Sequence, residues 1–161
     1  MEAAVILSGK QLLTLGIFEP QLTEKTVIRG RSAGPSLAGY DIRVSFGGEG
    51  NVRFLRKGDF LLATTVEKFR MPNNLLGVVH DKSTWARQGL AVQNTVIEPG
   101  WEGYLTLELT YQGDKTLEIS DGDPIAQVLF HIVSESTAGY DGKYQDQIQE
   151  AIPAILEDTD E

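Results

Sequence analysis

The sequence contains no cysteine, so disulfide bonds and thiolate metal ligands are excluded. Histidine is almost as scarce: only His80 and His131 are present, and no metal-ligand spacing relates them. Long hydrophobic runs are also lacking, because the longest one near the start, residues 3–7, is too short to span a membrane. Glu2 stands where a signal peptide would carry positive charge. We therefore expect a cytoplasmic protein without a membrane partner.

An excess of positive charge is lacking as well. The formal net charge of −9 argues against a nucleic-acid polymer as the main partner, because phosphate contacts need clustered lysine and arginine. A single small polyphosphate is still compatible with this charge if a few cations converge locally. Part of the acidity lies at the very end of the chain, in Glu157, Asp158, Asp160 and Glu161. Residues 148–161 are therefore expected to form an acidic, solvated tail, with disorder as one alternative.

Helical periodicity is rare in this chain of 161 residues, whose length fits one domain. Short helices are expected after Ser8 as N-cap, at 84–88 and near 147–156. Alternating or β-rich segments between turn residues predict strands at 40–44, 59–66, 76–79, 90–96, 104–111, 116–119 and 125–133. Many short strands with regular turns indicate an all-β sandwich, jelly roll or barrel with one or two short helices.

Residues 81–89, Asp-Lys-Ser-Thr-Trp-Ala-Arg-Gln-Gly, have the composition of an anion site. If Asp81 or Ser83 caps a short helix, its free N–H groups, Lys82 and the hydroxyls of Ser83 and Thr84 point to one place. Arg87 follows Ser83 by one helical turn and falls on the same face. A capped surface helix with its tryptophan packed inward explains the same residues equally well.

Residues 96–109 contain a Pro99-Gly100 turn, which predicts a hairpin between two strands. In the second strand, alternation places Tyr104, Thr106 and Glu108 on one face and three leucines on the other. A carboxylate on a half-buried strand acquires a raised pKa, as a general acid or base requires. The simpler alternative is that Glu108 faces water.

Two further segments carry weaker signals. Residues 36–43 contain a glycine turn and a strand with alternating charges, which also fits a solvent-facing edge strand. Residues 140–147 are polar with two tyrosines, and they either fold over a ligand as a lid, with Lys143 for phosphate, or form a frayed end.

Taken together, these motifs resemble the dCTP deaminase family of the dUTPase-like superfamily. The resemblance covers residues 5 to 147 in order and rests on Ile-Leu-Ser-Gly-Lys-Gln (6–11), residues 58–67 and 71–77, Lys-Ser-Thr-Trp-Ala-Arg-Gln-Gly-Leu (82–90), Ile-Glu-Pro-Gly-Trp-Glu-Gly (97–103) with Leu-Thr-Leu-Glu (105–108), Gly122 with Ile-Ala-Gln (125–127), and Lys-Tyr-Gln-x-Gln (143–147). It implies a distorted jelly-roll (β-clip) protomer within residues 1–147, in which 138–147 is the C-terminal lid. It also implies a homotrimer with active sites at the subunit interfaces, and dCTP or dUTP as ligand.

The resemblance also assigns roles to residues. Glu108 is the general acid/base, with Ser83 and Arg87 beside the attacked carbon. The triphosphate, held with Mg²⁺ rather than by metal ligands of the protein, is assigned to Lys82, Thr84, Lys143 and Gln147, with help from Tyr140. The remaining substrate contacts are assigned to Trp85, Ala86, Glu98, Thr106, Leu107 and Gln127.

Zinc is not expected, because cytidine-type zinc deaminases hold their metal with histidine and cysteine. A carboxylate must then generate the nucleophile, which is the role given to Glu108. His131 is more simply a hydrogen-bonded structural residue of its strand.

The sequence departs from the deaminases in a slightly shorter 87–98 loop, in Glu98 where relatives have aspartate, and in a tail without the usual Gly-Pro and Ser-Arg ending. Ala-Gly-Tyr-Asp (38–41) is closer to the first dUTPase motif. The leading hypothesis is hydrolysis of dCTP to dUTP and ammonia, with continuation to dUMP and pyrophosphate as a variant. The alternatives are a dUTPase-type pyrophosphatase that uses Glu98 and, from another class, a non-catalytic nucleotide-binding trimer.

Overall fold

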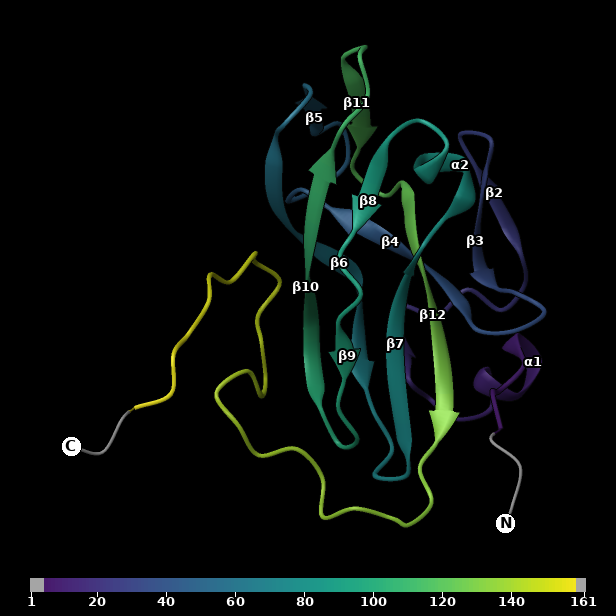
Figure 1. The fold of residues 1–161 in the computed structure, drawn as a ribbon. Coiled ribbons are helices and arrows are strands. Elements are labelled where there is room, and N and C mark those ends of the chain that lie inside the picture. Colours follow the sequence, from purple (N-terminus) through teal and green to yellow (C-terminus); the bar gives the residue numbers. More distant parts are fainter. Residues whose placement is uncertain (1–4, 159–161) are drawn as a thin grey trace.

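The computed structural model describes residues 5–158, and antiparallel strands make up almost all of its regular structure (Figure 1). The helices in these residues are two single turns, α1 (Gly9–Leu12) and α2 (Ser83–Ala86). The strands are β1 (Phe18–Glu19), β2 (Thr26–Ile28), β3 (Arg31–Pro35), β4 (Tyr40–Ser45), β5 (Val52–Leu55), β6 (Phe60–Arg70), β7 (Leu75–Asp81), β8 (Leu90–Val92), β9 (Val96–Ile97), β10 (Glu102–Tyr111), β11 (Leu117–Ser120) and β12 (Pro124–Ile132). The predicted all-β fold with one or two short helices is confirmed. Within the described range, neither helix is long and apolar enough to cross a membrane.

Ten strands join in one large sheet, whose main path runs β8-β10-β6-β4-β12-β7-β9. β1 extends β6, β2 and β3 extend β4, and β5 pairs with β11 in a small separate sheet. β4 connects the two parts of the large sheet, because its residues 40–43 pair with β12 and residues 44–45 pair with β6. The interpretation of 36–43 as a solvent-facing edge strand is therefore wrong. β4 is central, and Asp41 is only 5% exposed.

The core lies on the apolar faces of these strands, and aromatic rings fill its centre. Phe18 stacks on Tyr40 with ring centroids 3.9 Å apart, and its edges meet Phe69 and Phe130 at 5.4 and 5.6 Å. Such offset and edge-to-face contacts stabilise a core beyond the burial of area alone. At the start of the chain, Ser8 forms the predicted N-cap of α1, accepting a hydrogen bond from the backbone N–H of Gln11 (3.2 Å).

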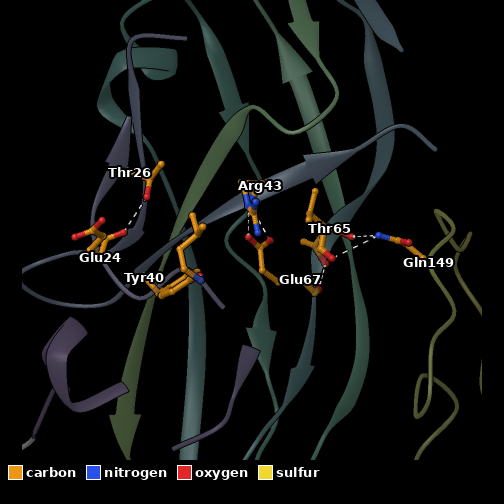
Figure 2. A network of polar contacts seen from close by, with 9 residues as sticks. Glu24, Thr26, Tyr40, Arg43, Thr65, Glu67 and Gln149 are labelled. Atoms are coloured by element: carbon orange, nitrogen blue, oxygen red, sulfur yellow. Dashed lines mark hydrogen bonds and ion pairs between the residues drawn. The ribbon is translucent and has the colours of Figure 1, made fainter. Parts of the chain in front are cut away.

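A buried ion pair joins β4 to β6 (Figure 2). Arg43 Nε lies 2.7 Å from Glu67 Oε1, and the backbone N–H of Arg43 donates to the other carboxylate oxygen (3.0 Å). Burial raises the pKa of Glu67, while the charge of Arg43 opposes the rise. Beside this pair, the Thr65 hydroxyl donates to the Glu67 carbonyl (2.7 Å) and accepts from Leu105 N–H (3.0 Å). The network therefore fixes β10 against β6.

Three sequence predictions about local structure are wrong. The helix expected near 147–156 is absent; Pro153 disfavours a helix there, and the segment instead makes long-range contacts described below. The strand expected at 90–96 is divided into β8 and β9 by a tight turn, in which Thr95 N–H donates to the Gln93 carbonyl. The hairpin expected around Pro99 does not form, because β9 pairs with β7 while β10 pairs with β6 and β8. That turn therefore crosses between the two parts of the sheet.

Candidate active site

A cavity of about 490 Å³ opens between β10, the turn after β9 and the chain beyond residue 139. Its volume is within the range of small-molecule sites. Five of the residues that the sequence singled out line it together: Glu98, Thr106, Glu108, Tyr140 and Gln147. The lining also includes apolar side chains that the sequence did not indicate, among them Phe60 and Leu62. The structure thus gathers these five predicted residues, which are up to 49 positions apart (147 minus 98), around one hollow.

β10 presents Thr106 and Glu108 to the cavity because of its alternation and a local irregularity. Its register against β6 shifts between Tyr104 and Thr106, and Leu105 is turned so that it also lines the cavity. Leu107 points the opposite way: its side chain is fully buried in the core and does not line the cavity. A contact of Leu107 with a ligand is therefore limited to its backbone.

Glu108 is the chemically unusual group in this cavity. Its Oε2 atom is buried and has no hydrogen-bond partner, and its cross-strand neighbour on β6 is Leu62. Loss of water around the carboxyl group raises the pKa of Glu108. The alternative in which Glu108 simply faces water is therefore wrong. A buried acceptor without a partner is costly to retain, and such groups are common where chemistry occurs.

The lid segment, residues 138–147, docks on the turn at 99–102. Tyr140 N–H donates to the Pro99 carbonyl (2.7 Å), and the Trp101 indole N–H donates to the Tyr144 carbonyl (2.6 Å). The backbones of the lid and the turn come close together at Gly100, whose φ is +77°. A Cβ atom added to Gly100 would lie only 2.5 Å from Gly139 Cα. At the end of the lid, the Gln147 carbonyl accepts from Tyr104 N–H (3.0 Å). These bonds hold Tyr140 and Gln147 over the cavity.

α2 carries the predicted anion-binding residues, and its geometry partly differs from the prediction. Lys82 occupies the N-cap position without a side-chain cap bond, so neither Asp81 nor Ser83 is the cap. Asp81 Oδ1 instead accepts from Val92 N–H (2.6 Å). Ser83, Thr84, Ala86 and Arg87 are exposed on the outside of the turn.

Trp85 packs inward, as expected for the alternative in which residues 81–89 form a surface helix. Its side chain is 1% exposed, and its indole N–H donates to the Pro124 carbonyl (2.6 Å). The guanidinium of Arg31 lies over the Trp85 ring, 3.6 Å from its centroid. Any contact of Trp85 with a substrate would therefore involve the backbone.

Lys82 and Gln127 belong to a second polar cluster, at the junction of β3, β4, β7 and β12. Lys82 Nζ lies 3.0 Å from Asp41 Oδ2, with both side chains less than 10% exposed, and Ser32 bonds to both of them. Gln127, opposite Asp41 in the β4–β12 register, donates to the Ala38 carbonyl (2.8 Å). The sequence did not indicate Ser32, and it placed Asp41 only in a charged strand of unassigned role.

The predicted site residues therefore fall into two groups within one chain. Five line the Glu108 cavity, whereas the α2 residues and Gln127 do not, as far as residues 5–158 are concerned. Lys143 belongs to neither group. It is part of the lid, and its Nζ atom lies 3.1 Å from Oε1 of Glu157 in the tail. The tail itself was not predicted to contribute, yet Ile152, Pro153 and Ala154 line the cavity.

The chain is similar in sequence to known dCTP deaminases. The dCTP deaminase of Campylobacter hominis is 34% identical over 176 aligned residues, covering 92% of this chain and 93% of that protein. The dCTP deaminase of Protochlamydia amoebophila is 36% identical over 152 residues, covering 77% and 81%. Among solved structures, the 2′-deoxycytidine 5′-triphosphate deaminase of Agrobacterium tumefaciens superposes with a TM-score of 0.62 at 15% identity, over 81% of this chain and 49% of that one.

EIAV dUTPase superposes with a TM-score of 0.54 at 24% identity, over 79% of this chain and 97% of that one. At these identities the two structures show the fold alone, and they confirm that it is dUTPase-like. A family model described as dCTP deaminase-like matches residues 33–133, more than half of the chain. The chain therefore belongs to the dCTP deaminase-like family.

Proposed function

We propose that the protein hydrolyses dCTP to dUTP and ammonia without zinc, with Glu108 as the general acid/base. The observation that carries the proposal is the partly buried Glu108 carboxyl group, with one oxygen that lacks a partner, in a cavity lined by four other predicted site residues. The family relationship supports the same reaction, because the relatives named above are dCTP deaminases.

The proposed reaction requires Glu108 in both of its protonation states. The ionised carboxylate accepts a proton from water as the water oxygen bonds to C4 of the cytosine ring. N3 of the ring takes up that proton as the tetrahedral intermediate forms, and Glu108 then carries the hydroxyl proton of the intermediate to the exocyclic amino group. The C4–N bond breaks, C4 becomes a carbonyl, and ammonia leaves. A raised pKa brings the two forms of Glu108 closer in free energy near neutral pH, which favours a group that must accept and return a proton.

The α2 turn is proposed to act on the cavity of another copy in a homotrimer. Ser83, Thr84 and Arg87 are exposed and do not line the cavity of their own chain, which supports a role toward a neighbour. Phe60 and Val96, at the cavity, are 61% and 52% exposed and offer apolar surface for such contact. A closed symmetric assembly would place each α2 turn beside a neighbouring Glu108.

The triphosphate is proposed to bind Lys82, Thr84, Lys143 and Gln147, and to bring Mg²⁺ with it. Within residues 5–158 no three or more histidine or acidic side chains are grouped to hold a metal ion. Phosphate oxygens of the nucleotide, rather than protein side chains, would therefore bind Mg²⁺. A cytoplasmic location remains a prediction of the sequence.

A dUTPase-type pyrophosphatase is the second candidate, because Glu98 also lines the cavity. It would position the water that attacks phosphorus, and a bifunctional variant would continue from dUTP to dUMP and pyrophosphate. Glu98 is exposed, whereas Glu108 is partly buried with a raised pKa, and this difference favours deamination.

The test compares Glu108→Gln with Glu98→Gln. We expect Glu108→Gln to abolish ammonia release from dCTP while it retains nucleotide binding, and Glu98→Gln to keep measurable ammonia release. Full hydrolysis of dUTP to dUMP by Glu108→Gln, with loss in Glu98→Gln, would support the pyrophosphatase. Binding without turnover by the unaltered protein would support the non-catalytic trimer.

A further inference from the structure

The chain after the lid crosses the cavity as an extended strap, defined here as residues 149–157. Ile152, Pro153 and Ala154 of the strap line the cavity that contains Glu108. The strap contains no regular secondary structure, so its position depends on its contacts with the rest of the protein. Those contacts involve two residues assigned above to the substrate, Thr106 and Lys143.

One set of contacts joins the strap to β6 and β10. The Gln149 side-chain amide donates to the carbonyls of Thr65 (3.2 Å) and Val66 (3.5 Å) on β6, next to the buried Arg43–Glu67 network (Figure 2). Three residues later, the backbone N–H of Ile152 donates to Thr106 Oγ1 (3.2 Å). Thr106 is a residue assigned above to the pyrimidine site, and the strap occupies an acceptor position on its hydroxyl.

The other set of contacts joins the strap to the lid. Lys143 Nζ, assigned above to the triphosphate, lies 3.1 Å from Glu157 Oε1. The Tyr144 hydroxyl accepts from Ile155 N–H (2.8 Å) and donates to the Ile155 carbonyl (3.2 Å), which holds the strap beside the lid. The Glu157 carboxylate is thus paired with the lysine that is proposed above to bind the triphosphate.

We propose that the strap is autoinhibitory: in the free protein it engages Thr106 and Lys143, and the nucleotide must displace it to bind. This inference rests on the function proposed above, because it takes both residues as nucleotide contacts. The carboxylate imitates a phosphate oxygen, while the Ile152 N–H imitates a donor of the pyrimidine. The individual contacts are weak, since an exposed ion pair and a single hydrogen bond each stabilise little. The strap therefore lowers affinity without preventing binding.

Hydrogen exchange distinguishes displacement from simple closure. Full-length Glu108→Gln protein is incubated with dCTP and Mg²⁺, and exchange is followed separately in peptides covering 138–147 and 149–156. We expect the nucleotide to slow exchange in the lid and to accelerate it in the strap. Slower exchange in both segments would mean that the strap closes on the nucleotide, and it would overturn the proposal.

Affinity supplies the second test. In the Glu108→Gln background, the anchor variant combines Gln149→Ala with Glu157→Gln and removes the side-chain contacts of the strap with β6 and Lys143. The control, Glu150→Gln, removes one tail charge that makes no ion pair among the described residues. We expect calorimetry to give dCTP binding roughly three- to tenfold tighter in the first variant, from the loss of one ion pair and the side-chain hydrogen bonds, and unchanged binding in the control. Equal affinities, or no dCTP binding in any variant, would overturn the strap proposal.

The two proposals fail in different measurements. Lack of ammonia release by the unaltered protein contradicts deamination, even if the anchor variant binds dCTP more tightly. Normal ammonia release with equal affinities in the anchor variant and its control contradicts autoinhibition and leaves the proposed reaction intact.

Discussion

Glu108 on β10 lies directly opposite Leu62 on β6. The cross-strand neighbour of this carboxyl group is therefore an apolar residue. Burial raises the pKa of Glu108, and its Oε2 atom has no hydrogen-bond partner. Because both residues line the cavity, the pair connects the sheet register with the proposed chemistry.

Leu62→Asn should lower the pKa of Glu108, because an amide near the carboxylate stabilises its ionised form. The acid limb of the profile of kcat/KM for dCTP against pH should then move to lower pH, while Leu62→Met should leave it in place. An unchanged limb in Leu62→Asn would show that another group controls the rate in acid.

Glu108→Gln should stabilise the fold at neutral pH. The folded-state pKa of Glu108 is raised, so its favourable contribution is present below the unfolded-state pKa and is lost as the pH rises through the folded-state value. Relative to the unaltered protein, the variant should therefore be more stable near pH 7 and equally stable below about pH 4. Urea unfolding at the two pH values measures this difference, and a gain that persists in acid would exclude titration of Glu108 as its cause.

Glu67→Leu should lower the free energy of unfolding by about 3 kcal/mol, because it leaves Arg43 buried without its counter-charge. Arg43→Met combined with Glu67→Leu should recover part of that loss, since no buried charge remains. Denaturant titration of the single and double variants provides the measurement. A double variant less stable than the single one would show that the ion pair itself, rather than the unpaired charge, determines stability here.

The face of the strand that Glu108 shares with Thr106 was predictable from the sequence, whereas the burial of its carboxyl group and the contribution of the tail were not. Alternation of polar and apolar residues along 104–111 predicts which side chains share a face of the strand. The structure keeps this alternation except at Leu105, where the register shifts. The tail has no comparable local signal: the N–H of Ile152 bonds to Thr106, 46 residues away, and only the fold brings the two together.

The same physical reason explains the errors at the turns and the short strands. Whether Pro99-Gly100 closes a hairpin or a crossover depends on which strand pairs with β9, and β7 is remote in sequence. β1, β2, β3 and β5 were not predicted because each is held by pairing with distant or short partners rather than by a long alternating pattern. The inward packing of Trp85 was one of two interpretations that the sequence left open.

Mixing two inactive variants tests whether α2 acts on a neighbouring copy. Glu108→Gln and Arg87→Ala should each lose ammonia release. Subunits exchanged between them should regain roughly a quarter of the activity, because one site in four combines an intact glutamate with an intact α2 turn in a closed ring. Absence of recovery, with exchange verified by mass, would place both groups in one chain.

Product analysis from dCTP and Mg²⁺ tests the central claim most directly. The unaltered protein should release one ammonia for each dCTP consumed, with dUTP or dUMP as the deaminated nucleotide, and Glu108→Gln should release none. Formation of dCMP without ammonia, or undiminished ammonia release by Glu108→Gln, would contradict a deamination that depends on this carboxylate.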